Sequence, residues 1–441
     1  MSQPTIRGSA IVAYTKWVIR WRWPVLAITL AVVAVLASGA RFLAFSNDYR
    51  VFFGGENPQL QAFEALQNIY TKNDNILIVL APEDGDVFTP TTLAAVEDLT
   101  RESWQVPFAI RVDAITNFQH TEAEGDDLLV DDLIIDAPGL TEAEIERARA
   151  IALAEPLLAN RLIPEGSAVT GVNITLELPG ESLTETPEAA AFARQIAADI
   201  EEKYPGITTY LSGMVMLNNA FGEAAQKDIQ TLIPLMYLGI IVVMGLMLRS
   251  VSGTIVTVVV IGLSVATAMG IAGWLGIQLT PPSASAPTMI MTLAVADSVH
   301  ILVTMLRSMR LRASKHEALI ESVRVNMQPV FLTSATTAVG FLSMNFSDVP
   351  PFHDLGNMTA MGVIAAWVFS VTTLPALLSV LPLRVRQFAT GEQTVMDRLG
   401  NFVVARRRPL LWGMAAVVVV LGALIPRNDL NDRFVDYFDQ S

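Results

Sequence analysis

The stretch LAVADSVHILVTMLR, residues 293–307, places an aspartate and a histidine inside an apolar segment. If Arg307 marks one end of a membrane helix, ten residues at about 1.5 Å each place Asp297 about 15 Å deep, near the middle of a bilayer core about 30 Å thick. An aspartate there costs about 2.5 to 3.5 kcal/mol, so membrane helices that keep one generally use it for ion or proton traffic. We therefore predict a membrane protein with a titratable group at its centre.

A polar stripe runs from Asp297 toward the end of this segment. His300 follows after three residues, Thr304 after seven and Ser308 after eleven, so the four side chains share one helical face. A proton relay requires groups whose charge can change and that lie within hydrogen-bond reach of one another or of water. Asp297 and His300 are the candidates for such a relay, although a purely structural polar contact would produce the same pattern.

Neighbouring hydroxyl groups either extend this relay or serve helix packing. Ser298 and Thr304 lie in the same segment, and Thr333 and Thr337 share one face of the next apolar segment at a similar depth. Small and hydroxylated residues are also common where membrane helices pack together. Both interpretations stay open for these four residues.

The rest of the chain repeats the apolar character of this segment. Hydrophobic residues make up 52% of the 441 residues, which favours a polytopic α-helical membrane protein over a soluble one. One apolar span precedes a long acidic stretch, five follow in quick succession, and a last one comes near the end. Each is close to the roughly 20 residues that a bilayer requires. The seven expected spans cover residues 23–45, 229–248, 254–277, 286–306, 328–346, 355–381 and 409–426.

Lysine and arginine are concentrated in alternate loops. Such loops stay in the cytoplasm, so we expect a cytoplasmic N-terminus and an extracytoplasmic position for the acidic stretch, residues 46–228. The connections on the other side have no lysine or arginine. The basic loops contain Arg307, Arg310, Arg312, Lys315 and Arg324, and then Arg384, Arg386, Arg398, Arg406, Arg407 and Arg408.

The acidic stretch alternates strand-like and helix-like patterns, which predicts a small α+β domain. Short apolar stretches mark the strands, with alternation at 168–178, and longer runs mark the helices. The expected strands cover residues 75–81, 168–178 and 207–211, and the expected helices 89–103, 141–154 and 187–203.

Several classes of function are disfavoured. A formal net charge of −14 opposes nucleic-acid binding, and the absence of cysteine rules out disulfides and thiolate metal sites. The acidic run 122–132 lacks the glycine and the ligand spacing of a calcium loop, so we interpret it as a solvated face. No phosphate-binding loop or nucleophile motif is present. We expect no enzyme activity, no metal and no cofactor, and an ion gradient as the energy source.

The start of the chain is echoed near its end. RWPVL (22–26) resembles RRPLL (407–411), and NDYRVFF (47–53) resembles NDRFVDYF (431–438), with an offset of about 385 residues in both cases. A repeat at constant spacing indicates a duplicated unit. We interpret the chain as one complete unit followed by the start of a second, whose remainder is missing.

These features resemble the resistance-nodulation-division (RND) transporter superfamily, in particular its MmpL-like, hopanoid-exporter-like branch. The resemblance rests on FSNDYRVFFGGENPQLQAF (45–63), LAVADSVHILVTMLR (293–307) and PVFLTSATTAVGFLSMNFSDVPPFHDLG (329–356), and it covers essentially the whole chain. The five-span cluster is also similar to the sterol-sensing domain of Patched and Niemann-Pick type C proteins. The chain would then be the N-terminal half of a transporter plus its seventh membrane helix.

The resemblance implies export of lipids or other hydrophobic or amphiphilic cargo across the bacterial inner membrane, driven by the proton gradient. It places the proton-carrying acid of the family at Asp297. Leu293 and Ser298 stand where the family usually has a glycine and a tyrosine or second acid. It also implies contact with membrane lipids, and a missing C-terminal half, a partner half-transporter or a higher oligomer.

The expected organisation follows from the spans, the basic loops and the resemblance. It comprises a cytoplasmic amphipathic lead-in (1–22), a first membrane helix (23–45), a porter-like outer domain (46–228), a bundle of five membrane helices (229–383), a cytoplasmic linker with an amphipathic helix (384–408), a seventh membrane helix (409–426) and the start of a second outer domain (427–441).

Two other functions are compatible with this architecture. A sterol- or lipid-sensing membrane module without transport would tolerate loss of the proton on Asp297. An accessory of protein secretion, like the SecD and SecF pair, would share the half-transporter plan, but the signature motifs of that pair are not found in this sequence.

Overall fold

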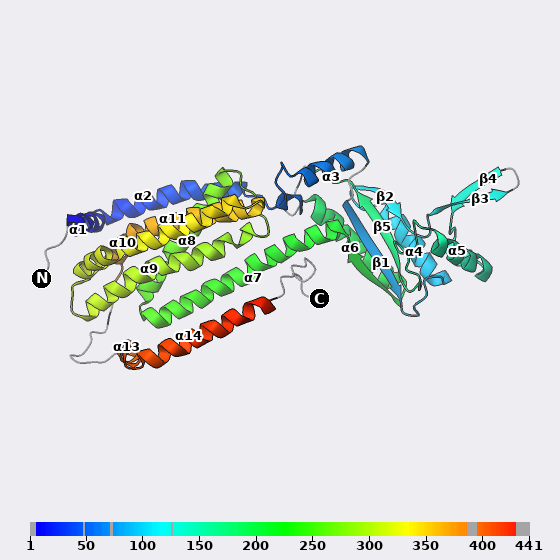
Figure 1. The fold of residues 1–441 in the computed structure, drawn as a ribbon. Coiled ribbons are helices and arrows are strands. Elements are labelled where there is room, and N and C mark those ends of the chain that lie inside the picture. Colours follow the sequence, from blue (N-terminus) through cyan, green and yellow to red (C-terminus); the bar gives the residue numbers. More distant parts are fainter. Residues whose placement is uncertain are drawn as a thin grey trace. The chain divides into compact units, whose positions relative to one another are not determined.

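The computed structural model describes residues 6–46, 49–70, 74–124, 127–180, 182, 184–383, 385 and 395–428 (Figure 1). These residues form two compact units. The larger unit contains the elements from α1 (Ile6–Arg20) to α12 (Thr373–Val380), and the smaller contains α13 (Val395–Ala405) and α14 (Arg407–Leu424). The predicted start of a second outer domain lies almost wholly outside the described residues, as does much of the linker before α13.

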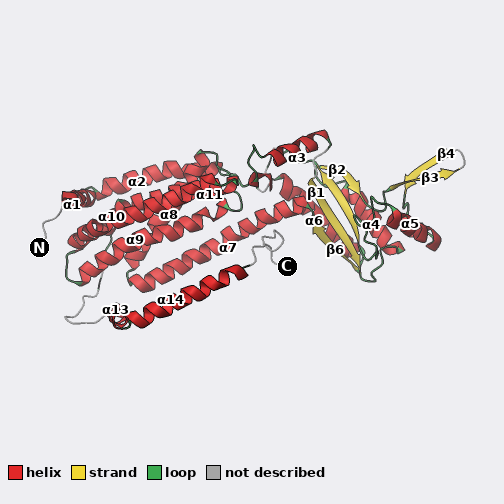
Figure 2. Cartoon of the chain, viewed as in Figure 1, coloured by secondary structure: helices red, strands yellow, loops and turns green. Residues whose placement is uncertain are grey.

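In the part of the chain that the structure describes, six helices are long and apolar enough to cross a membrane. The chain is therefore a multi-pass membrane protein. Five of the six belong to the larger unit, where they form most of a helical bundle (Figure 2). The six spans are Arg22–Phe42 (α2 with its 3₁₀ extension), Met214–Leu248 (α7), Val251–Trp274 (α8), Ser283–Arg310 (mostly α9, Ala286–Arg310), Pro350–Val380 (α11, Pro350–Val371, and α12) and Arg407–Arg427 (mostly α14).

The expected span at 328–346 lies within α10 (Lys315–Leu342), which is not among these six. The first ten residues of α10 include Lys315, Glu317, Glu321 and Arg324, so its apolar part begins only in its second half. That half also carries several serine and threonine residues, which lower its hydropathy. Its crossing of the membrane stays a prediction.

The helix α7 is longer than the apolar pattern indicated. It begins at Met214, about fifteen residues before the expected start of the span at residue 229, and runs for 35 residues. Gly213 separates it from the preceding strand with a φ of +105°, and a side chain there would collide with the backbone of Asn75. The strand and the membrane helix are thus joined by one glycine rather than by a flexible loop.

The α+β part of the larger unit is built on an antiparallel sheet with strand order β2-β5-β1-β6. Residues of β1 alternate between buried and half-buried, which is typical of a sheet covered on one face. Apolar residues of the helices α4 and α6 share a buried core with Ile76 and Ile78. The bounds are β1 Asp74–Pro82, β2 Ala109–Asp113, β5 Thr170–Leu176, β6 Ile207–Ser212, α4 Pro90–Ser103 and α6 Glu185–Lys203.

The three expected strands and three expected helices of this region all form, within a few residues of their predicted ends. The sequence did not indicate β2, nor the separate hairpin of β3 (Gln119–Glu124) and β4 (Asp127–Asp132). All six residues of β4 are exposed, which agrees with a solvated acidic run. The remaining helices here are α3 (Pro58–Ile69) and α5 (Glu142–Ala154).

A buried carboxylate ties α4 to the end of α6. Asp98 accepts hydrogen bonds from Lys203 and Tyr204, and from Arg101 on its own helix. Burial alone would raise the pKa of Asp98, but these donors outweigh it and hold the pKa below its ordinary value. A lowered pKa in the folded state means that the contact stabilises the fold above about pH 3.9 and is lost as the pH falls through the folded-state value.

Helix α8 contacts the end of the first span through glycine. A β-carbon on Gly270 would lie 2.1 Å from the carbonyl oxygen of Leu36, and one on Gly273 would lie 2.0 Å from that of Gly39. Main chain therefore packs directly on main chain, as small residues allow in membrane helices. Gly262, on the same helix, has no such neighbour within 4 Å.

This contact predicts opposite results for two glycine substitutions in α8. Gly270→Ala should lower the melting temperature, because main chain cannot rotate away from the new methyl group, and overpacking of this kind costs about 1–3 kcal/mol. Gly262→Ala should keep or slightly raise it, because alanine favours a helix by about 1 kcal/mol over glycine. Thermal unfolding of both variants in detergent, followed by tryptophan fluorescence, checks this. Equal melting temperatures would contradict the packing.

Candidate functional site

The apolar residues of α9 hold Asp297 inside the larger unit. Ile290, Ala294 and Ile301 recur at spacings of four and seven, are fully buried, and lie on the same side of the helix as Asp297. Asp297 itself is only 6% exposed. A carboxylate in such a place costs free energy unless it is hydrogen-bonded or protonated.

Ser334 of α10 meets this carboxylate. Its hydroxyl donates to Asp297 Oδ2 at 2.7 Å, and the same oxygen lies 2.8 Å from the carbonyl oxygen of Val330, its alternative acceptor. A hydroxyl has one proton to donate and lone pairs to accept with, so it cannot serve both acceptors fully at once. The geometry therefore allows two hydrogen-bond arrangements around Asp297.

The register of α10 explains why Ser334 faces Asp297. Ser322, Asn326, Val330, Ser334 and Ala338 follow one another at intervals of four and are all buried. They form one stripe on the helix, and three of its five members, Ser322, Asn326 and Ser334, are polar. This spacing of four is visible in the sequence, but the prediction from sequence chose the adjacent stripe, which contains Thr333 and Thr337.

Thr333 and Thr337 belong to that neighbouring stripe. Thr333 is exposed, and its hydroxyl has two alternative acceptors on its own helix, the carbonyl of Val330 at 2.9 Å and that of Pro329 at 3.2 Å. Thr337 is half-buried. Neither residue is hydrogen-bonded to Asp297 in the described structure, where the carboxylate's hydrogen-bond partner is Ser334.

The polar stripe along α9 also contacts α10. Thr304 donates to the carbonyl of His300 at 3.0 Å and accepts from the Asn326 amide at 2.9 Å. Ser308 donates to the carbonyl of Thr304, again at 3.0 Å. Asn326 was not singled out from the sequence, yet it continues the line of contact from Ser334 along the same helix.

The two other candidate residues of α9 have no hydrogen bond to Ser334 among the described contacts. Ser298 is fully buried, and its hydroxyl lies 3.4 Å from that of Ser370 on α11, so it bridges a different pair of helices. His300 lies one turn beyond Asp297 with its imidazole exposed on the surface of the chain. The structure thus brings Asp297 together with Ser334, and Thr304 together with Asn326.

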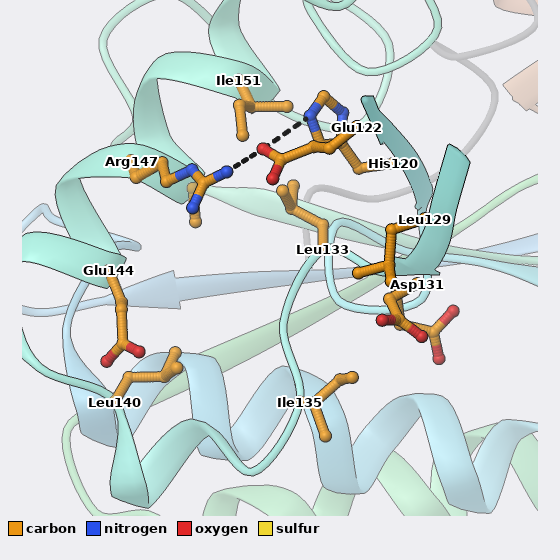
Figure 3. A pocket seen from close by; sticks show the side chains of 12 residues that line it. His120, Glu122, Leu129, Asp131, Leu133, Ile135, Leu140, Glu144, Arg147 and Ile151 are labelled. Carbon is orange, nitrogen blue, oxygen red and sulfur yellow. Dashed lines mark hydrogen bonds and ion pairs between the residues drawn. The ribbon is translucent and has the colours of Figure 1, made fainter. Parts of the chain in front are cut away.

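A separate hollow of about 400 Å³ lies between the hairpin β3–β4 and α5 (Figure 3). One of the four acidic residues that line it, Glu122, is paired with Arg147 and lies 3.4 Å from His120. This carboxylate already has cationic or polar partners. Among the described residues, no group of three or more histidine, aspartate or glutamate side chains could hold a metal ion.

Two curated proteins resemble parts of this chain. MmpL12 of Mycobacterium tuberculosis, named as a probable transport protein, is 24% identical over 257 residues, which cover 56% of this chain and 22% of MmpL12. HpnN of Rhodopseudomonas palustris, named as a hopanoid transporter, is 27% identical over 214 residues, which cover 46% of this chain and 23% of HpnN. The match spans less than a quarter of the length of either relative.

A family profile gives the broader match. It covers residues 56–411, which include the α+β part, the whole of the bundle from α7 to α12, and Asp297 with Ser334. This extent, together with the two relatives, confirms the resemblance indicated by the sequence motifs. The chain belongs to the MMPL family.

Proposed function

We propose that this protein takes part in exporting a lipid or another amphiphile across the bacterial inner membrane, driven by protons that bind Asp297. The observation that supports this most directly is a carboxylate buried in an apolar bundle and hydrogen-bonded by one serine hydroxyl. The printed names of MmpL12 and HpnN support transport as the activity. The name of HpnN, a hopanoid transporter, is our basis for a lipid-like cargo.

The two acceptors of Ser334 suggest how protonation of Asp297 would change the hydrogen bonds around it. When Asp297 is ionised, Ser334 donates to Oδ2. When Asp297 binds a proton, its own O–H donates to Ser334 Oγ, and the serine proton turns to the carbonyl of Val330. Each protonation state then has a complete set of hydrogen bonds, so the exchange leaves no buried polar group unpaired. A change in proton occupancy becomes a change in the contact between α9 and α10.

We place His300 at the interface with a second helical bundle. Ionisable residues in membrane helices almost always face protein or water rather than lipid. His300 is exposed in this single chain, so in the membrane it should face either another protein surface or a hydrated cavity. A second half-transporter would provide both, with His300 passing protons to Asp297 one turn away.

For orientation, we propose a cytoplasmic N-terminus and an extracytoplasmic α+β part. The basic residues between α9 and α10 support this, because positively charged loops stay in the cytoplasm. Helix α7 then enters the membrane from the outside, and the loop near Leu311 lies in the cytoplasm.

The first prediction concerns Asp297. Asp297→Asn keeps the size of the side chain and removes its proton-binding charge, so we expect normal insertion and abundance but loss of gradient-driven export. The export is measured as lipid export by cells that carry the complete transport system. The protonation of Asp297 is measured separately, by infrared difference spectra recorded as a function of pH. The C=O band of the protonated carboxyl should be absent from Asp297→Asn and shifted in Ser334→Ala, which lacks the hydrogen-bond partner.

Thr333→Ala is the matched control for Ser334→Ala, because the two residues are adjacent and only Ser334 contacts Asp297. We expect Thr333→Ala to keep both the band and the export activity. His300→Ala should weaken export less than Asp297→Asn does. Undiminished, gradient-dependent export by Asp297→Asn would refute the coupling through this carboxylate.

A second prediction concerns topology, and the absence of native cysteine makes it simple to test. A cysteine at Gln195, exposed on α6, should react with an impermeant maleimide in intact cells, whereas one at Leu311 should react only after permeabilisation. Leu311 is 67% exposed, and its replacement leaves the Ser314–Glu317 capping box of α10 intact. Labelling of position 311 from outside would reverse the proposed orientation.

A further inference from the structure

The sheet of the α+β part has an open face with a hollow of about 730 Å³. Helices α4 and α6 bury the side of β1 that carries Ile76 and Ile78, so Asn75 and Leu77 point to the opposite side, where the hollow lies. Its volume falls in the range of about 300–1,000 Å³ that small-molecule sites occupy. The hollow is therefore large enough to hold part of an amphiphile.

The walls of the hollow are divided between hydrocarbon and polar groups. Leu77, Leu157 and Leu162 supply apolar surface, and Leu157 remains 59% exposed at the hollow. On the sheet, Asn75 Nδ2 donates to Asn173 Oδ1 at 2.7 Å, Asn75 Oδ1 accepts from the N–H of Met214 at 3.2 Å, and Asn173 Nδ2 lies 3.5 Å from Thr175 Oγ1. Each amide NH₂ still has a second hydrogen to donate. This combination matches a ligand with an apolar chain and a polar head.

The charge of the hollow comes from Arg161. Its neighbour Arg111 is paired with Asp113 at 2.8 Å, so that pair is neutral. Arg161 has no ion pair among the described residues, although acidic residues outnumber lysine and arginine in the chain by 43 to 29. The other described arginines of the α+β part all have carboxylate partners: Arg50, Arg101, Arg111, Arg147, Arg149 and Arg194.

The loop that carries Arg161 is held in place by its backbone. The Arg161 N–H donates to the carbonyl of Leu158 at 3.1 Å, and Leu158 is only 2% exposed. The carbonyl of Leu162 accepts from the N–H of Gly171, on β5, at 2.8 Å. These hydrogen bonds fix the backbone of Arg161 against the sheet. A ligand would therefore not have to order the loop when it binds.

We propose that this hollow binds an anionic amphiphile, with its carboxylate or phosphate head on Arg161 and its hydrocarbon chain against Leu77, Leu157 and Leu162. A small inorganic anion would leave the leucine walls in water, and an uncharged lipid would leave the guanidinium without a counter-ion. As a statement about cargo the assignment rests on the proposed export function, whereas the binding itself does not.

The test uses the full chain in nanodiscs of phosphatidylcholine and a palmitic acid that carries a diazirine. After illumination, mass spectrometry should find the adduct on the peptides that contain Leu157 to Leu162. Arg161→Gln should reduce this labelling about three- to fivefold, the effect expected of a solvent-accessible ion pair. Arg161→Lys should keep most of it, and Leu157→Asn should reduce it by removing apolar contact.

Arg147→Gln is the matched control, because it removes the same charge from the other hollow of the same part and should leave the labelling unchanged. Competition by palmitic acid or by a single-chain phosphate monoester supports the site and tells a carboxylate head from a phosphate head. Equal competition by palmityl alcohol, equal labelling of Arg161→Gln, or adducts confined to the membrane helices would overturn the proposal. Asp297→Asn should label normally, so a failure of transport stays distinguishable from a failure of binding.

Discussion

The hydrogen bond between Ser334 and Asp297 constrains how α9 and α10 can pack, because a buried carboxylate needs a hydrogen-bond partner. A neutral hydroxyl stabilises a carboxylate but does not cancel its charge. The buried charge still costs free energy, and binding a proton would remove that cost. A lysine or arginine in place of Ser334 would hold the carboxylate permanently ionised. The small side chain of serine also fits at the buried contact with α9, and Asn326, Val330 and Ala338 are buried on the same stripe of α10.

The apolar spans could be predicted from the sequence because a membrane helix is an uninterrupted run about 20 residues long. The predicted depth of Asp297 comes from counting residues along one such run, and it stays a prediction. Helix α10 was harder to classify, since four charged residues open it and hydroxyl groups divide the rest. In the α+β part, β1 was recognisable as a run of apolar residues and β5 from its alternation. Strand β2 also alternates, with Ile110 and Val112 between Arg111 and Asp113, but it is only five residues long, which is too short to be distinctive.

The partners of Asp297 were less accessible to sequence reasoning. Thr333 and Ser334 differ by one position, which on an α-helix is a rotation of about 100°, and only the packing of α10 decides which of them turns inward. The missing ion-pair partner of Arg161, in the part of the chain that the structure describes, was equally hard to predict from the sequence. The arginine itself was visible from the start, but the lack of a carboxylate beside it depends on contacts among segments far apart in the chain.

The continuity of β6 and α7 has a mechanical consequence. The helix is 35 residues long, so at about 1.5 Å per residue it extends about 52 Å, well beyond a hydrocarbon core of about 30 Å. One continuous helical rod therefore reaches from the bilayer to the edge strand of the sheet, and Gly213 joins the two at a position that a side chain could not occupy. A tilt or twist of its membrane half acts as torque on β6, with Pro234 as the point where the rod can flex.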